Sequence, residues 1–198
     1  MKNVNKKGFT LIELLAVIVI LGVLLAVAVP AVTKYITSSK KSGYIDNMKY
    51  FMDSARSEVL DGEYNAPVST NEATVIYFDH LQPKLEKGGK TSSYGAAYDM
   101  NNSFVVIVNE GTAEKPDQKY YVAARDVSGY GIGVVTSSAT TAKIIQYDEL
   151  KNENVVQLTA GATCTTTNNK VDGSVTSETL SVQPGTLSNV KVTRIYKK

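Results

Sequence analysis

Residues 9–32 read FTLIELLAVIVILGVLLAVAVPAV, and this apolar stretch decides the fold. Only Thr10 and Glu13 are clearly polar within it. A helix over this range spans roughly 36 Å, which is enough to cross a hydrocarbon core of about 30 Å. An ordinary secretory signal has a shorter apolar region and then a small-residue cleavage site, whereas residues 33–60 have the pattern of a continuing helix. We therefore predict a retained membrane helix.

Glu13 lies inside this apolar run, where a carboxylate costs on the order of 3 kcal/mol and usually has a function. In one interpretation it is a first-turn acid that complements the helix dipole near the membrane interface. In the other, a cut between Gly8 and Phe9 creates an α-ammonium on Phe9, one helical turn from Glu13. A buried carboxylate needs such a partner, and a partner on a neighbouring chain would make Glu13 a registration device for assembly. The physics alone leaves both interpretations open.

Residues 6–13 read KKGFTLIE, and with the apolar run they closely resemble the class III signal of type IV prepilins. The shared features are a short basic leader, Gly8 at the cut, Phe9 as the first mature residue and Glu13 as the fifth. The resemblance implies that a prepilin peptidase cuts after Gly8 and methylates the Phe9 amine, and that Glu13 acts in subunit assembly. It also implies an ATPase-driven assembly platform in the inner membrane. The resemblance does not extend past the membrane segment.

Two further residues of the run, Gly22 and Pro30, fall where such pilins often carry helix-breaking residues. Pro30 removes one backbone donor, and Gly22 lowers helix propensity by about 1 kcal/mol relative to alanine. Both are also tolerated as ordinary residues of membrane helices. The resemblance favours a role in helix flexibility. The positive-inside rule does not decide the orientation of the helix, because each flank carries three lysines: Lys2, Lys6 and Lys7 before it, and Lys34, Lys40 and Lys41 after it. The resemblance to prepilins places the N-terminus in the cytoplasm.

Beyond the membrane run, apolar residues recur at spacings of three and four and mark one helix face. These residues are Tyr44, Met48, Phe51, Met52, Ala55, Val59 and Leu60. The pattern predicts one helix from Phe9 to Leu60, about 78 Å long by its rise. Gly62 suits the left-handed capping position that ends a helix.

The remaining chain is typical of short strands separated by turn-rich segments. Residues 74–85 are expected to form a strand or a short helix that Pro83 ends. The expected strands are 93–100, 104–109, 119–124, 131–136, 143–147 and 190–196. They predict an antiparallel meander with one face on the helix and the other solvated.

The expected fold class is therefore α+β and ladle-shaped, with a long N-terminal helix packed on an antiparallel sheet. Its parts are a leader (1–8), a transmembrane and polymerisation helix (9–32), an amphipathic continuation of that helix (33–62) and a β-rich pilin head (63–198).

Composition argues against several other classes of protein. Three of the 21 basic residues and one of the 19 acidic residues precede Thr33, so the exported part carries 18 of each, which disfavours a nucleic-acid groove. His80 and Cys164 are the only residues of their kinds. A histidine-based triad or a His/Cys metal site therefore lacks members, and we expect no enzyme activity, cofactor or metal. Cys164 cannot close the disulfide common in Gram-negative pilins, which fits the Gram-positive kind.

The sequence thus predicts a structural subunit of a type IV pilus for adhesion, twitching motility or aggregation. Its expected partners are itself, other pilins, the prepilin peptidase and membrane lipid before assembly, with nucleic acid a minor possibility at the basic C-terminus. We expect it in the cytoplasmic membrane first and on the cell surface after assembly. One alternative is a pseudopilin of a type II secretion or DNA-uptake machine. Another is a membrane-tethered binding module that does not polymerise.

Overall fold

A computed structural model describes Gly8 and residues 10–81, 89–133, 135–136, 142–157, 162–163, 180–183, 186–187 and 190–196. The chain divides into two compact units, Met1–Ser39 and Lys40–Lys198. In chain order, the strands begin with β1 (Glu72–Tyr77), β2 (Phe104–Asn109), β3 (Gln118–Arg125), β4 (Tyr130–Ile132), β5 (Val135–Thr136) and β6 (Ala142–Gln146). Two 3₁₀ turns follow, η1 (Tyr147–Glu149) and η2 (Asn152–Asn154). The last strands are β7 (Val156–Gln157), β8 (Ala162–Thr163), β9 (Leu180–Gln183), β10 (Thr186–Leu187) and β11 (Lys191–Tyr196).

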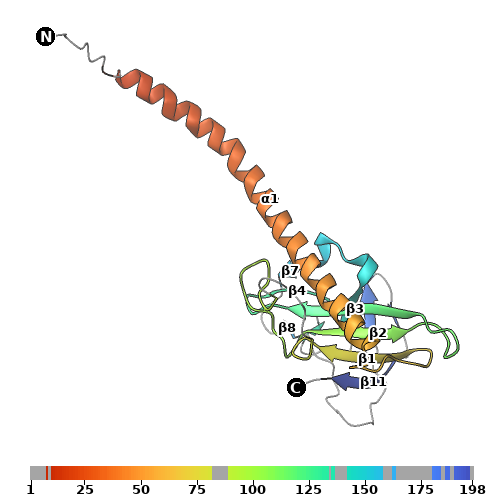
Figure 1. Cartoon of the computed structure of the whole chain (residues 1–198). Helices are drawn as coiled ribbons and strands as arrows, with labels where there is room; N and C mark the ends of the chain where they lie inside the picture. Colours follow the sequence, from red (N-terminus) through yellow and green to blue (C-terminus); the bar gives the residue numbers. More distant parts are fainter. Residues whose placement is uncertain are drawn as a thin grey trace. The chain divides into compact units, whose positions relative to one another are not determined.

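The predicted long helix is confirmed as α1 (Leu11–Leu60), which continues through Pro30 (Figure 1). Its C-terminus closes as the sequence indicates. Gly62 adopts a left-handed φ of +82°, its N–H donates to the carbonyl of Val59, and the Glu63 N–H donates to that of Glu58. These two bonds form a Schellman motif, which satisfies carbonyls that the end of a helix leaves without partners.

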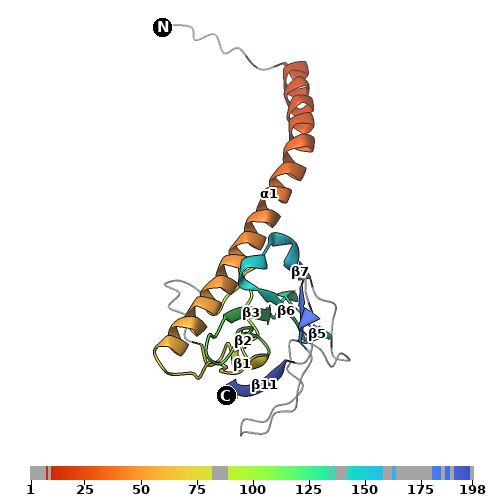
Figure 2. The same cartoon turned by 90° about the vertical axis from the view of Figure 1, so that its right-hand side faces the viewer.

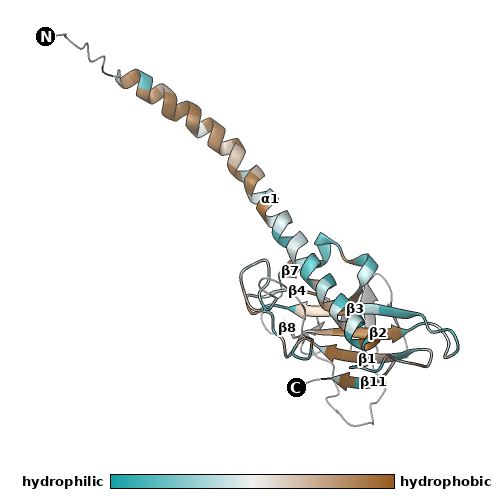
Figure 3. Cartoon of the chain, viewed as in Figure 1, coloured by the Kyte–Doolittle hydropathy of each residue, from teal (hydrophilic) through white to brown (hydrophobic). Residues whose placement is uncertain are grey.

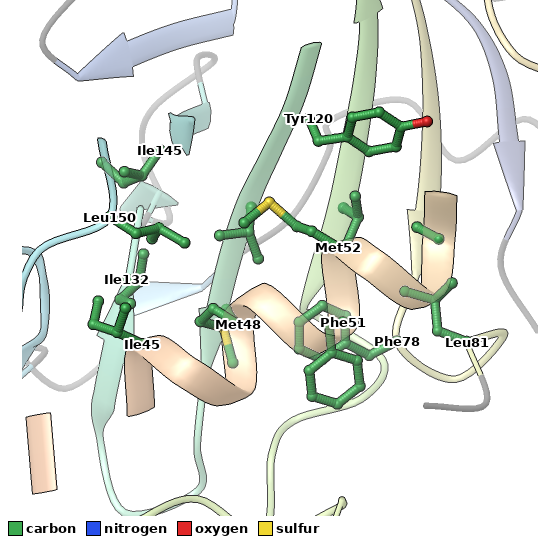
Figure 4. Packing of buried hydrophobic residues seen from close by; sticks show 14 of the residues in the cluster. Ile45, Met48, Phe51, Met52, Phe78, Leu81, Tyr120, Ile132, Ile145 and Leu150 are labelled. Atoms are coloured by element: carbon green, nitrogen blue, oxygen red, sulfur yellow. The ribbon is translucent and has the colours of Figure 1, made fainter. Parts of the chain in front are cut away.

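The C-terminal part of α1 buries one face against the sheet of its own unit, as predicted (Figure 4). The predicted face is largely right: Tyr44, Met48, Phe51, Met52 and Ala55 are buried, and Val59 is half-buried. Leu60 is 80% exposed, so its assignment to this face is wrong, and the buried residue that the prediction missed is Ile45. The physical reason is angular: Leu60 points about 140° away from Ala55, whereas Ile45 lies a turn or two below Met48 and Met52.

The sheet is mostly antiparallel, with the path β10-β9-β6-β3-β2-β1-β11. Off this path, β4 pairs with β3, and β7 pairs with β4. Figure 2 shows the C-terminal part of α1 beside this sheet from a second direction. A simple antiparallel meander is wrong in two places, because β11 runs parallel to β1 and β9 parallel to β6. The C-terminal strand thus returns to pair with the first strand of the head. This α+β arrangement, an apolar helix followed by a mostly antiparallel sheet, confirms the predicted fold class.

The opposite face of the sheet is also buried, which corrects the prediction of a solvated face. Val75, Tyr77, Phe104, Val106 and Val108 are 0% exposed and belong to a second cluster, separate from the one that contacts α1. The sequence carried the signal, since residues 104–108 read FVVIV, and a continuous apolar run is typical of a strand buried on both faces.

Two predicted strands are wrong because each contains a glycine with a positive φ, which interrupts an extended strand. Residues 93–100 form a turn with isolated bridges in place of a strand, and Gly95 sits there at a φ of +86°. Residues 131–136 divide into β4 and β5, with Gly133 between them at a φ of +61°. Residues 74–85 begin within the strand β1, and the predicted stop at Pro83 lies outside the described residues.

Candidate functional site

The N-terminal part of α1 presents apolar side chains in every direction. Each residue from Leu11 to Lys40 is exposed, and the large apolar side chains there include Leu11 at 83% and Val27 at 74% exposure. Figure 3 shows the first half of the helix as mostly hydrophobic, with a hydrophilic residue near its start and more hydrophilic residues toward its middle. A helix that is apolar all round needs a membrane or other helices to cover it. By length and composition, α1 is the one helix among the described residues that could cross a membrane, a test that signal sequences also pass.

Glu13 closes the start of this helix through a reciprocal contact with Thr10. Its Oε2 accepts hydrogen bonds from the Thr10 backbone N–H and the Thr10 hydroxyl, both at 2.8 Å. In return, the Glu13 N–H donates to Thr10 Oγ at 3.3 Å. This is a capping box, with Thr10 as the N-cap and Glu13 three residues later. The first-turn interpretation of Glu13 did not include this contact, although the spacing Thr-x-x-Glu in the sequence indicates it.

The capping box gives the first-turn interpretation of Glu13 a definite geometry. The capping box involves only one oxygen of the carboxylate, because its hydrogen bonds are made by Oε2 and by the Glu13 N–H. Among the described residues, Oε1 has no hydrogen bond. Glu13 is also exposed. The carboxylate can therefore cap its own helix and still accept a cationic group from another chain.

The predicted cleavage junction lies just before this cap. Gly8 is exposed, and a Cβ placed on it would meet no atom within 4 Å. Phe9 lies outside the described residues, so the structure supplies no geometry for its amine. Accessible backbone at Gly8 is what a peptidase requires of its substrate, and cleavage after Gly8 with methylation of Phe9 stays a prediction.

The two predicted flexible positions lie within continuous helix. A Cβ added at Gly22 would meet nothing within 4 Å, and Pro30 is followed by helix to Leu60. The Thr33 hydroxyl donates to the Val29 carbonyl at 2.9 Å, so this polar group is satisfied within its own helix. Flexibility at Gly22 and Pro30 stays a prediction.

His80, the single histidine of the sequence, lies in an aromatic cluster. Tyr64 Oη lies 3.4 Å from His80 Nδ1 and donates to the His80 carbonyl at 3.2 Å. The Tyr64 and His80 rings pack edge to face, and Tyr196 of β11 lies against both. Within the described residues, no group of three His, Cys, Asp or Glu side chains could hold a metal ion. Cys164 and the C-terminal Lys197 and Lys198 lie outside the described residues.

Taken together, the exposed apolar helix, its capped acidic start and the α+β head define a class of protein with a long N-terminal helix that must be covered by lipid or by other helices. Comparison with known proteins agrees. A family profile described as "Prokaryotic N-terminal methylation motif" matches residues 3–29.

Curated relatives extend the match into the head. A "Fimbrial protein" of Pseudomonas aeruginosa is 34% identical over 54% of this chain and 69% of its own length. A "Type IV major fimbrial protein FimA" of Dichelobacter nodosus is 28% identical over 55% of this chain and 71% of its own length. A "ComG operon protein 3 homolog" of Bacillus licheniformis is 49% identical over 20% of this chain and 40% of its own length. No solved structure gave a significant match.

The chain belongs to the type IV pilin family. This is a family of structural, non-enzymatic proteins, which confirms the expectation that the chain is not an enzyme.

Proposed function

We propose that the chain is a structural subunit of a type IV pilus, cut after Gly8, methylated on the Phe9 amine and polymerised through its N-terminal helix. The observation that carries the proposal is the exposed apolar surface of residues 11–36, joined to a head with its own buried core. Such a surface requires a cover, and parallel packing against further copies would bury it repeatedly. The similarity of residues 3–29 to the methylation motif supports processing at its start.

Glu13 is the residue that we assign to subunit assembly. In lipid, its carboxylate is partly satisfied by Thr10. In a filament, the methylated Phe9 ammonium of one subunit would pair with Glu13 of the next, because neither charge is tolerated alone in an apolar bundle. The prepilin peptidase and the assembly platform are the partners that this cycle requires. The subunit would sit in the cytoplasmic membrane, N-terminus inside, and then in the surface pilus.

The test is to shear filaments from the cell surface and determine the N-terminal mass of their subunits. We expect a chain that begins at Phe9 and carries one added methyl group. A filament subunit that begins at Met1, or a chain cut beyond Val32, would contradict the processing. The absence of this chain from sheared filaments would contradict the pilus role.

A second candidate is a pseudopilin of a type II secretion or DNA-uptake machine. The observation in its favour is the similarity to the ComG operon protein 3 homolog, which carries no fimbrial name, although that match spans only 20% of this chain. A chain that is processed after Gly8 yet stays in the envelope fraction, with no sheared filament, would favour this second function.

A further inference from the structure

Six charged residues at the C-terminal part of α1 and its cap form two rows, one basic and one acidic, and Lys40 and Glu58 belong to neither row. The basic row is Lys41, Lys49 and Arg56, and the acidic row is Asp46, Asp53 and Asp61, the last of which directly follows the end of α1. At about 100° of rotation per residue, the members of each row lie within about 80° of one another, and the rows are centred about 100° apart. Each row therefore occupies its own quarter of the helix surface.

Contacts within the head hold two members of the basic row, Lys49 and Arg56, toward one flank. Lys49 Nζ lies over the Tyr147 ring at 5.9 Å, and the Arg56 guanidinium lies 4.7 Å from the Tyr120 ring centroid. The acidic row is exposed along its length, and Tyr147 Oη donates to Asp53 at 3.3 Å. The ion pairs found among the described residues, Lys119–Asp117 and Arg125–Asp99, involve neither row.

The spacing between the rows matches the stagger of the proposed filament. If the Phe9 amine of one subunit meets Glu13 of the next, the two parallel helices are shifted by four residues, or about 6 Å. Subunits of a regular filament share one axial rise, so the same shift applies along the whole helix. This four-residue shift brings Lys49 level with Asp53 of the neighbour. The pairs Lys41–Asp46 and Arg56–Asp61 are five residues apart, and their long basic side chains can span the additional 1.5 Å. A shift in the opposite direction would place no acid opposite any of the three basic residues.

We propose that the face formed by the two rows, from Lys41 to Asp61, docks a second copy of this chain, with the half-buried to exposed basic row of one subunit against the exposed acidic row of the next. The proposal rests on the proposed function and goes beyond it by assigning the residues that fix the register in the head region. Ion pairs of this kind select partner and register, since like charges brought together by a wrong shift repel.

Lys41 and Asp46 allow a clean test, because side chains five residues apart on one helix point about 140° apart and do not meet within a chain. Lys41→Asp alone should lower the yield of sheared filament about tenfold, since a repulsion replaces an attraction at every subunit. Asp46→Lys alone should do the same. When both variants are expressed in one cell, alternating filaments restore opposite charges at every contact, and we expect near-normal yield with the two chains in equal amounts.

A matched variant tests the register itself. A twelve-residue shift, about 18 Å, would instead pair Lys41 with Asp53. We therefore expect that Lys41→Asp is not rescued by co-expressed Asp53→Lys. Rescue by Asp53→Lys and not by Asp46→Lys would overturn the proposed register, and normal filaments from Lys41→Asp alone would overturn the interface. If the unaltered chain forms no filament in the same cells, the proposed function fails instead. Equal amounts of each variant in the membrane fraction show that folding and insertion are intact.

Discussion

Substitutions of Glu13 and Thr10 can separate helix capping from intermolecular pairing. Loss of the Thr10 cap should cost about 1 kcal/mol of helix stability, or roughly fivefold. Loss of the Glu13 charge should leave the Phe9 ammonium of the neighbour unpaired in an apolar bundle. That penalty is about 3–5 kcal/mol for each added subunit, or at least a hundredfold in the equilibrium for addition. The two roles therefore differ in magnitude enough to be distinguished by filament yield.

Glu13→Gln is the decisive variant, because glutamine can still complete a capping box but carries no charge. We expect Glu13→Gln and Glu13→Ala to be nearly absent from sheared filaments, and Thr10→Ala to be incorporated at a moderately reduced level. The measurement is the ratio of variant to unaltered chain in membranes and in sheared filaments of cells that express both. Normal incorporation of Glu13→Gln would refute the pairing argument and leave Glu13 as a cap. Loss of Glu13→Gln from the membrane fraction would place its action earlier, in insertion or processing.

Three further predictions concern the stability of the solubilised full chain, measured by thermal or denaturant unfolding. Gly62→Ala should lose about 1 kcal/mol, because Gly62 has a φ of +82°, and Gly62→Asn should lose less; equal stability would contradict the cap. Phe51→Ala should lose about 3–5 kcal/mol, because the ring is 0% exposed and stacks on Phe78 at 3.8 Å. Burial raises the pKa of Tyr98 above its ordinary 10.0, although the hydrogen bond from Asn47 alone would lower this pKa. The folded state therefore holds this proton more tightly, so stability should fall above about pH 10, and less steeply in Tyr98→Phe.

The helix could be predicted in full because its signals are local. The apolar run, the three-and-four spacing after it and the Gly62 stop all act within a few residues of one another, and α1 follows them from Leu11 to Leu60. The strands β2, β3 and β11 were recognisable for the same reason. Gly95 and Gly133 were visible as turn residues, and greater weight on them would have corrected both strands that the sequence placed wrongly.

The order of the strands could not be predicted, because it depends on contacts between distant residues. Lys191 pairs with Glu72 in the parallel β1–β11 ladder, and no local pattern selects that partner over another strand. The candidate site shows the same division. Thr10 and Glu13 are three residues apart, so their contact was readable from the sequence. The proposed partner of Glu13 in a filament is the Phe9 amine of another chain, and only the chemistry of the two charges predicts that pair.

If Glu13 acts in assembly as proposed, its geometry would let one carboxylate cap the helix in the membrane and pair with a neighbour in the filament. Before assembly, a bare carboxylate near the membrane interface would be costly, and two hydrogen bonds from Thr10 to Oε2 lower that cost. If those bonds used both oxygens, an incoming ammonium would have to displace Thr10 and uncap the helix. Because Oε1 lies outside the capping box, pairing can be added to the cap without opening it. The sequence Thr-Leu-Ile-Glu is thus consistent with the proposed subunit, whose capped carboxylate would remain able to accept the charge of its neighbour.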